Sequence, residues 1–424
     1  MHASRPACGV SSFVLVSLLD KNQLTLTDTL KRAFPFVLLC AYGLFTCGYF
    51  FLEDYSGHYR LFARFVFFLG LFVLVSGIRE NYRHPLFQVI AIYIFYMLLS
   101  GFWATPMDWF RLGQKFTISV YIISFITIMY FLVQWNRDLF ERMLQVCILI
   151  AAAAALISLV VFYRDNPFPG ARMEGLGALS NVNEFSNVYG VFGLLAMGFA
   201  LRTQTLGSKL LLFVAVAIFI SYAWFGQSRT AFVSMIIALV TLAGLTRQRR
   251  SLFVAIVAAV LFGAILLLLF PDTSEQAFLR GMGLRPQIWA GAWSEAVLAP
   301  VFGHGLTSDV AVMVGKNVFE TAHNAYLQAF WQGGVIGLGL LLLVLLVAFR
   351  YALAYGRQQG DYTVLCMLIF VVCTMMTGVD TLIDRPRDKW MLFWFPLGLL
   401  LSYRALIPPG GTNVTSTGVE RTEP

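Results

Sequence analysis

The sequence is poor in charge. Of its 424 residues only 12% are Asp, Glu, Lys or Arg, whereas 59% are hydrophobic, and the mean hydropathy is +0.75. A soluble domain typically has about 25% charged and about 45–50% apolar residues, so this chain has too few charges to cover its apolar residues with a water-facing surface. The shortage excludes a cytosolic enzyme and a disordered chain, and it indicates an integral membrane protein with many spans.

The motifs of soluble enzymes are also missing. The sequence contains no phosphate-binding GxxxxGK[ST], no GxSxG, no HExxH and no CxxC. It also lacks the Asp-x-Asp pair that would hold a metal and a nucleotide sugar. The six cysteines lie in apolar runs or in the N-terminal tail, which excludes a disulfide framework. Any reaction is therefore predicted to use no metal, no cofactor and no nucleotide.

The net charge of +8 comes from basic residues in the loops between apolar segments. In a soluble protein such an excess would suggest nucleic acid as a partner. In a membrane protein it is better explained by orientation in the bilayer or by binding of a phosphate-bearing lipid. We expect membrane lipids, and no nucleic acid, among the partners.

Long apolar runs make up most of the chain. About twelve stretches of roughly 16–22 residues are apolar on all faces, as lipid-exposed helices require, because a spanning backbone must satisfy its own hydrogen bonds. They lie near residues 33–52, 61–78, 86–103, 114–134, 143–163, 185–201, 210–224, 230–246, 251–270, 326–349, 361–379 and 389–407. The sequence thus predicts an all-α, polytopic membrane protein.

The apolar runs divide the chain into five parts. Residues 1–32 form a tail whose apolar stretch is too short to span and has no convincing cleavage site, so we interpret it as interfacial or cytoplasmic, not as a signal peptide. Spans 1–9 fill 33–270, a large polar loop fills 271–325, and spans 10–12 fill 326–407. Residues 408–424, rich in Gly, Pro, Ser and Thr, are predicted to be a disordered tail.

The distribution of Lys and Arg predicts the orientation. An even number of spans places both termini on one side, and a weak basic excess, including the cluster Arg247, Arg249 and Arg250, places that side in the cytoplasm. The loop 271–325 then faces outward. Several cations remain on this outer side although orientation disfavours them, and an anionic ligand would explain their presence. They are Arg164, Arg172, Arg229, Arg280, Arg285, Arg385, Arg387 and Lys389.

Within the outer loop, Pro286 to Leu298 predicts a helix. Proline suits the first helical position, and the apolar residues that follow recur at helical spacing. They are Ile288, Trp289, Ala292, Trp293, Ala296 and Val297. This stripe would either rest on the membrane interface or pack against the helical bundle.

His323 is the histidine with the most suggestive position. It closes the outer loop directly before a predicted span, and the following Gly333, Gly334 and Gly337 would allow close helix packing. An imidazole with a pKa near 6.5 can take a proton from a hydroxyl at neutral pH. From the residues alone, His323 is either structural or a catalytic base.

Arginines at outer helix ends could bind an anion. Arg229, in a very short outer link, either snorkels to the interface or points into a cavity. Arg285 directly precedes Pro286, where a guanidinium and a helix N-terminus together suit phosphate, unless it is a solvated loop residue. Arg172 lies at another outer membrane edge. In the charged run 384–389 we single out Asp384 and Arg385 and interpret the other charges as solvated.

Four segments resemble a known family. His323-Asn324 followed by nine residues, Gly334, two residues and Gly337 is similar to the His-[Asn/Ser/Gln]-x9-Gly-xx-[Gly/Thr/Tyr] motif of bacterial O-antigen ligases. These enzymes share a superfamily of polytopic glycosyltransferases with the O-antigen polymerases. The other resembling segments are Ser228-Arg229-Thr230, Arg285 to Trp289 with Pro300 to Gly305, and Asn181-Val182-Asn183, where Val182 departs from the family's proline.

The resemblance implies a GT-C-like enzyme of the bacterial inner membrane. Such a ligase moves O-antigen polysaccharide from undecaprenyl pyrophosphate to lipid A–core at the periplasmic face, inverting the anomeric centre without metal or nucleotide. It implies catalytic roles for Arg229, Arg285 and His323, with Arg229 and Arg285 also binding substrate. Substrate binding is further expected of Arg172, Asn324, Asp384 and Arg385.

Two other functions remain open at this point. A polymerase of the same superfamily uses the same donor but extends another lipid-linked glycan, and the histidine motif favours the ligase. A transporter with twelve spans would place ionisable groups near the middle of the membrane. Here the charges lie at outer ends and the halves show no convincing repeat, which disfavours transport.

Overall fold

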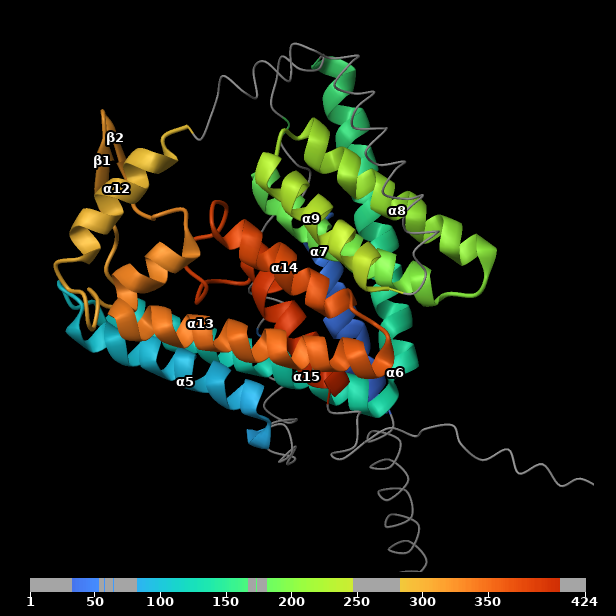
Figure 1. Ribbon diagram of the computed structural model, residues 1–424, viewed down its shortest axis with the longest axis horizontal. Coiled ribbons are helices and arrows are strands. Elements are labelled where there is room, and N and C mark those ends of the chain that lie inside the picture. The colour runs from blue at the N-terminus through green and yellow to red at the C-terminus, as the bar shows by residue number, and fades with distance from the viewer. Residues whose placement is uncertain are drawn as a thin grey trace, which may run out of the picture.

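The computed structural model describes residues 33–52, 57, 64, 82–166, 173, 181–246 and 283–404. These residues are predominantly helical and form a bundle with a small cap at one end (Figure 1). The helices, in chain order, are Ala33–Gly48, α5 (Pro85–Ser100), α6 (Trp109–Asp165), α7 (Val182–Arg202), α8 (Leu206–Phe225), α9 (Arg229–Leu245), α12 (Arg285–Ala296), α13 (Ala325–Gln359), α14 (Thr363–Met375) and α15 (Phe395–Arg404). Short turns of 3₁₀ helix, η2 (Gly101–Trp103), and π helix, η3 (Trp390–Trp394), precede α6 and α15.

Five stretches of the described chain are long and apolar enough to cross a membrane. They are Pro85–Trp103, Trp109–Asp165, Val182–Arg202, Leu206–Phe225 and Ala325–Gln359. The shorter apolar helices are Ala33–Gly48, Arg229–Leu245, Thr363–Met375 and Trp390–Tyr403. The predicted stretches near 61–78 and 251–270 lie outside the described residues, while every other predicted stretch coincides with a helix. The prediction of a membrane protein with several spans is thus confirmed. The count of twelve spans stays a prediction.

Two predicted spans share the single long helix α6. The polar linker expected near residue 136 is a kink, where Asn136 has φ −159° and ψ 95°. The Oδ1 atom of Asn136 accepts a hydrogen bond of 3.0 Å from the backbone N–H of Leu139. Asn136 therefore caps the second arm of α6, as asparagine commonly does at a helix start, and the chain bends without a loop.

Helix α7 is the buried centre of the bundle. Of its apolar stretch 94% lies inside the protein, and α8, α9 and α14 pack around it (Figure 1). The ring of Tyr189 stacks on Phe50 at 5.3 Å and on Phe219 at 5.2 Å. Because a Cβ atom at Gly190 would lie 2.2 Å from the ring of Phe370, only glycine permits this approach of α14.

The cap comprises residues 283–324 and contains the predicted helix, α12. Ile288, Ala292 and Ala296 are buried on its inner face, and α12 packs against α13 and the strand β1. Of the two alternatives, packing against the bundle is therefore confirmed for this face. Trp293 lies further out, 56% exposed, with its ring stacked on Phe330 at 5.3 Å.

The cap also contains strands, which the all-α prediction did not include. β1 (Val312–Val314) pairs antiparallel with β2 (Asn317–Phe319) around a turn at Gly315, where φ is +62°. Val312 and Val310 are buried with Ala292, Ala322 and Trp331 in a separate small core. The hairpin forms because an apolar segment too short for a helix covers α12. The hairpin is confined to two strands of three residues in the cap, and the described chain is predominantly helical, as predicted.

Helix α13 is broken inside the bundle at Gly334, which has φ 63° and ψ −162°. The segment Pro300–Gly305 of the cap lies in the break. A Cβ atom at Gly334 would lie 2.1 Å from the carbonyl oxygen of Val301, and one at Gly303 would lie 2.5 Å from the backbone nitrogen of Gly334. Glycine is needed at both positions, because each has a positive φ and each meets backbone atoms.

Four backbone groups beside the break find partners outside α13. The carbonyls of Trp331 and Gln332 accept hydrogen bonds from the N–H groups of His304 (2.8 Å) and Gly305 (2.9 Å). The N–H of Val335 donates to the carbonyl of Pro300 at 2.8 Å, and the hydroxyl of Tyr96 in α5 donates to the carbonyl of Gly333 at 2.8 Å. The cap and α5 therefore replace the hydrogen bonds that α13 gives up.

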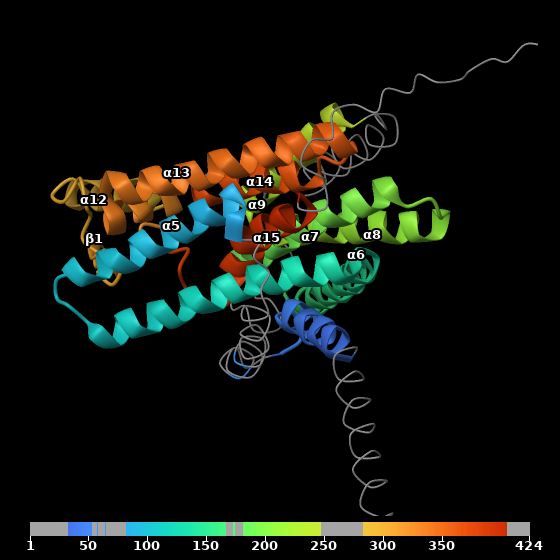
Figure 2. The ribbon, with the colours of Figure 1, turned by 90° about the horizontal axis from the view of Figure 1, so that it is seen from below.

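The prediction that the glycines allow close helix packing is correct for two of them. Cβ atoms at Gly333 and Gly337 would lie 2.9 Å and 3.3 Å from the sulfur of Met97, and α5 runs beside α13 (Figure 2). For Gly334 the prediction was wrong, because this glycine serves the break and not the contact with α5.

We expect Gly334→Ala to destabilise the protein. Forcing alanine into this region of φ and ψ costs about 1–3 kcal/mol, and the overlap with Val301 adds to that cost. Gly339→Ala is the matched control, because a Cβ atom there meets nothing within 4 Å. Thermal unfolding of the purified variants in detergent should show a melting temperature several degrees lower for Gly334→Ala only. Equal melting temperatures would mean that the break is not required.

Candidate functional site

The start of α13 positions His323. Asn324 is the N-cap of α13, and its Oδ1 atom accepts hydrogen bonds from the backbone N–H groups of Tyr326 (3.0 Å) and Leu327 (3.1 Å). His323 precedes the cap with φ 49°, a conformation that few residues other than glycine adopt. Its exposed ring meets Phe319 of β2 edge-on at 6.3 Å. His323 thus lies just before α13 with a backbone conformation that is not helical.

His304, the other histidine of the cap, is held differently. Its ring stacks on Trp331 at 4.1 Å, and its Nε2 atom lies 3.0 Å from the carbonyl oxygen of Glu295. Both contacts belong to the docking of the cap on α13. His304 is therefore a structural histidine, whereas His323 is an exposed residue outside this docking contact.

Three charged residues from separate elements act on His323. They are Asp380 from the loop after α14, Arg285 from the first turn of α12 and Lys389 directly before η3. Desolvation by the surrounding protein lowers the pKa of His323 below its usual 6.5; Asp380 opposes that shift, and Arg285 and Lys389 add to it. The lowered pKa favours the neutral imidazole, the form that can accept a proton.

Lys389 is the centre of a cluster of ion pairs. Its ammonium contacts Asp380 Oδ1 and lies 3.1 Å from Asp384 Oδ2. Lys115 of α6 approaches the other oxygen of Asp384 at 3.7 Å. Burial alone would lower the pKa of Lys389, but the carboxylates of Asp380, Asp384 and Asp388 together raise it. Burial likewise favours the neutral form of Asp384, and Lys389 and Lys115 outweigh it and lower that pKa.

Further contacts fix the loop that carries these charges. The indole N–H of Trp390 donates to the carbonyl of Asp384 at 2.9 Å, and that of Trp394 donates to the carbonyl of Leu382 at 3.1 Å. Lys115 also donates to the carbonyl of Ile383 at 2.9 Å. The loop is thus attached to α6 and to the start of the last helix through both its backbone and its side chains.

The interpretation of most of the run 384–389 as solvated was wrong. Asp388 is only 2% exposed, and burial raises its pKa, with Glu184 adding to the shift. Arg387 pairs with Glu184 of α7 at 3.4 Å. Arg385, which we had singled out, is exposed and forms no ion pair within the described part of the chain. Sequence reasoning missed Asp380 and Lys389, although the spacing of carboxylates at 380, 384 and 388 pointed to a shared partner.

Arg229 lies at the same end of the bundle. It is the first residue of α9 and is exposed. The hydroxyl of the next residue, Thr230, lies 2.7 Å from that of Thr377, which precedes Asp380 in the loop after α14. The structure thus brings His323, Arg285, Asp384 and Arg229 to one end. Arg172 lies outside the described residues.

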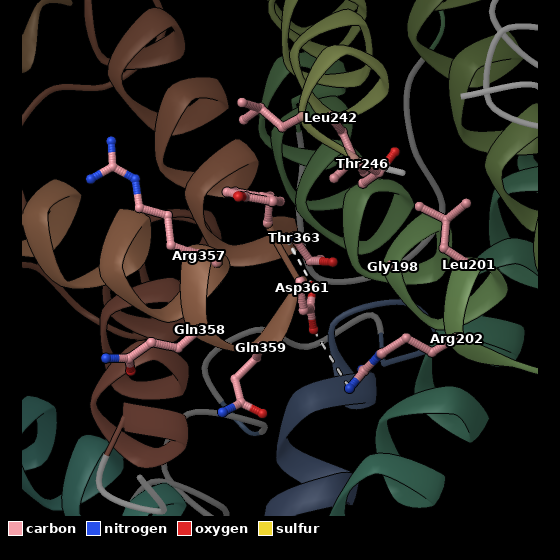
Figure 3. A pocket seen from close by; sticks show the side chains of 14 residues that line it. Gly198, Leu201, Arg202, Leu242, Thr246, Arg357, Gln358, Gln359, Asp361 and Thr363 are labelled. Atoms are coloured by element: carbon pink, nitrogen blue, oxygen red, sulfur yellow. Dashed lines mark hydrogen bonds and ion pairs between the residues drawn. The ribbon is translucent and has the colours of Figure 1, made fainter. Parts of the chain in front are cut away.

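A cavity of about 500 Å³ lies at the opposite end of the same helices (Figure 3). The last turns of α7, α9 and α13 line it, and so does Thr363 at the start of α14. Arg202, on its wall, is held by Asp361 at 3.6 Å and by Glu141 at 3.2 Å. Arg202 and Asp361 thus pair with each other across the cavity wall, and this cavity is not part of the site around His323.

Fold and site together define a helical membrane protein with a histidine and two arginines at one end of its bundle. A family model described as O-antigen ligase matches residues 211–342, a range that includes Arg229, Arg285 and His323. The chain is also 27% identical over 385 residues to the O-antigen ligase of Pseudomonas aeruginosa, an alignment that covers 88% of this chain and 92% of that protein. These matches confirm the resemblance to the O-antigen ligase family, a family of glycosyl-transfer enzymes.

Asn324 provides a test that separates capping from substrate binding. Asn324→Ala should destabilise the protein by about 1 kcal/mol, the usual cost of removing an N-cap, and should displace His323. Asn324→Ser keeps an oxygen acceptor and should retain both stability and glycan transfer. Thermal unfolding and transfer measured on the same preparations check this. Loss of transfer in the serine variant at unchanged stability would instead indicate that the amide binds substrate.

Proposed function

We propose that the protein is an O-antigen ligase of the bacterial inner membrane. It transfers polysaccharide from undecaprenyl pyrophosphate to a sugar hydroxyl of lipid A–core at the periplasmic face. The observation that carries this proposal is an exposed His323 directly before α13, with Arg285 and Arg229 at the starts of α12 and α9 at the same end of the bundle. A base and a cation at one membrane edge fit a hydroxyl nucleophile and a pyrophosphate leaving group.

His323 would act as the general base. It takes the proton of the acceptor hydroxyl as that oxygen attacks the anomeric carbon of the donor, and the bond from this carbon to the pyrophosphate oxygen breaks. Attack from the side opposite the leaving group inverts the anomeric centre, and the imidazolium later releases its proton to water. The weak sugar nucleophile needs this help most, and a base contributes about 10²–10⁴-fold.

Arg285 and Arg229 would bind the pyrophosphate. Arg285 begins α12 with Pro286 at the next position, so its guanidinium and the positive end of the helix dipole favour an anion together. Arg229 begins α9 in the same way. Guanidinium groups offer paired N–H donors that match phosphate oxygens, and they stabilise the charge that develops as the pyrophosphate leaves. We propose substrate contacts for Arg172 and Arg385 as well.

Asp384 and Asn324 are proposed to hold the site in place, in contrast to the arginines, which are proposed to bind substrate. The carboxylate of Asp384 faces Lys389 and Lys115, and the amide oxygen of Asn324 caps α13. These contacts support roles in holding the site more than direct binding of the glycan.

The second candidate is a polymerase of the same superfamily. The family model and the relative, both described as O-antigen ligase, favour the ligase. Deleting the gene separates the two: a ligase mutant accumulates long, unattached lipid-linked chains, whereas a polymerase mutant carries single repeat units on its lipid A–core. A transporter is disfavoured because the ion pairs of the described residues lie near helix ends or, for Glu141, beside the kink of α6 at Asn136.

Replacing either arginine should abolish transfer or reduce it severely. Arg285→Ala and Arg229→Ala remove the charge that faces the leaving group, and the lysine variants should recover little, because an ammonium lacks the paired donors. Lys316→Ala, an exposed change in the turn of the cap hairpin, is the control for altered cap charge. Transfer in membranes with matched protein amounts measures the effect. Near-normal transfer by an alanine variant would remove that arginine from the site.

His323→Gln should lose about 10²-fold or more of the transfer rate, because glutamine keeps a hydrogen bond but takes no proton. The wild-type rate should fall on acidification with a midpoint below pH 6.5, because the folded protein lowers the pKa of His323 and only neutral imidazole is a base. The pH dependence of the rate, with donor binding as the control, tests both points. Wild-type turnover by His323→Gln would leave the histidine with only an orienting role.

A further inference from the structure

Lys389 is a cation at the cap end that pairs with two carboxylates and is largely buried. Its side chain is only 12% exposed, and it is shared between the carboxylates of Asp380 and Asp384, which are 21% and 31% exposed. Lys389 directly precedes η3, whose Trp390 ring lies 5.2 Å from Phe125 and 6.0 Å from Phe45. The backbone of the lysine is therefore anchored in the bundle core, and its ammonium holds a loop that has no regular structure between Val379 and Arg387.

We propose that Lys389 is a positioning residue of the transfer reaction, because its ammonium clamps Asp380 and Asp384 in the loop after α14. The end of α14 meets the first turn of α13, which follows His323, where the hydroxyl of Tyr326 donates to the carbonyl of Val372 at 3.1 Å. The inference rests on the proposed role of His323 as the base. Lys389 does not touch the substrate in this account. It acts through Asp380, which loses its counter-ion when the ammonium is removed.

The charges that act on His323 allow the direction of the effect to be worked out. Asp380 raises the pKa of the imidazole, whereas Arg285 and Lys389 lower it. Removing the ammonium of Lys389 deletes one of the lowering charges and leaves Asp380 without its counter-ion. The pKa of His323 must then rise, so the imidazole stays protonated, and inactive as a base, up to a higher pH.

Lys115 provides a matched comparison. It contacts Asp384 at 3.7 Å and the carbonyl of Ile383 at 2.9 Å, so it holds the same loop from α6. It is not among the charges that act on His323. Lys115→Met and Lys389→Met therefore both weaken the attachment of the loop, but only Lys389→Met should change the titration of the histidine.

The experiment measures that titration directly. Purified full-length wild type, Lys389→Met and Lys115→Met are treated with diethyl pyrocarbonate, which acylates neutral imidazole, over a range of pH. Mass spectrometry of the peptide with His323 gives the midpoint, and His304 in the same sample is the internal reference. The midpoint should rise by about half to one pH unit in Lys389→Met, as expected for one charge near a partly solvated site, and should not change in Lys115→Met.

In Lys389→Met, the pH at which the transfer rate falls on acidification should rise by the same amount as the midpoint of His323. If the titration of His323 shifts and the rate profile does not, the positioning inference is also overturned, because Lys389 then acts on the imidazole without acting on the reaction. Loss of transfer in Lys389→Met with an unshifted midpoint contradicts the inference as well. The proposed function is tested separately by the transfer rate of His323→Gln. The outcome of that test does not depend on Lys389.

Two additional variants keep the proposal testable if Lys389→Met does not fold. Lys389→Arg keeps the charge and should keep the wild-type midpoint. If Lys389→Met does not accumulate, the double variant Lys389→Met/Asp384→Asn removes one charge of each sign and leaves Asp380 near His323. Its midpoint should also rise. An unchanged midpoint in the double variant, or an equal rise in Lys115→Met, would overturn the proposal.

Discussion

A helix that breaks inside an apolar bundle releases backbone groups that must find new partners, and this requirement organises the cap end of the protein. At Gly334 the released groups bond to the cap segment Pro300–Gly305 and to Tyr96 of α5. Leaving them unpaired in an apolar region would cost several kcal/mol. The cap is thereby docked on the helix whose first turn carries His323, and α12 brings Arg285 to the same place. The relative positions of His323 and Arg285 therefore depend on the break of α13 at Gly334.

The second constraint is the pairing of charges that the bundle partly buries. Lys389 offsets Asp380 and Asp384, and Arg387 offsets Glu184. Removing one partner of such a pair typically costs about 3–5 kcal/mol, so the loop between α14 and α15 has little freedom to rearrange. At the opposite end, Arg202 is similarly neutralised by Glu141 and Asp361. Within the described residues, the cap end differs in that it adds the exposed His323 and the arginines that begin α9 and α12.

Much of this arrangement could be predicted from the sequence. Apolar runs predicted the helices, because a spanning segment must be apolar along its whole length, and Pro286 with a periodic stripe predicted α12. The short hairpin could not be predicted, because its residues become apolar core only when α12 and α13 lie beside them. The role of Gly334 was hidden for a similar reason: glycine in an apolar helix permits either close packing or a break, and only the position of the cap decides between them. Lys389 and Asp380 were missed because charge in a loop is usually solvated, and their burial depends on α6 and α7.

The central claim is that this chain alone joins a lipid-linked glycan to lipid A–core. The most direct measurement is reconstitution of the purified protein in lipid with both substrates, without nucleotide and without an ion gradient. Gel electrophoresis would follow the lipopolysaccharide product. The account predicts that slow-migrating, glycan-bearing lipid A–core appears with the wild-type protein. A lengthened lipid-linked donor with unmodified lipid A–core would contradict it and identify a polymerase, and movement of the donor across the bilayer without any new bond would identify a transporter.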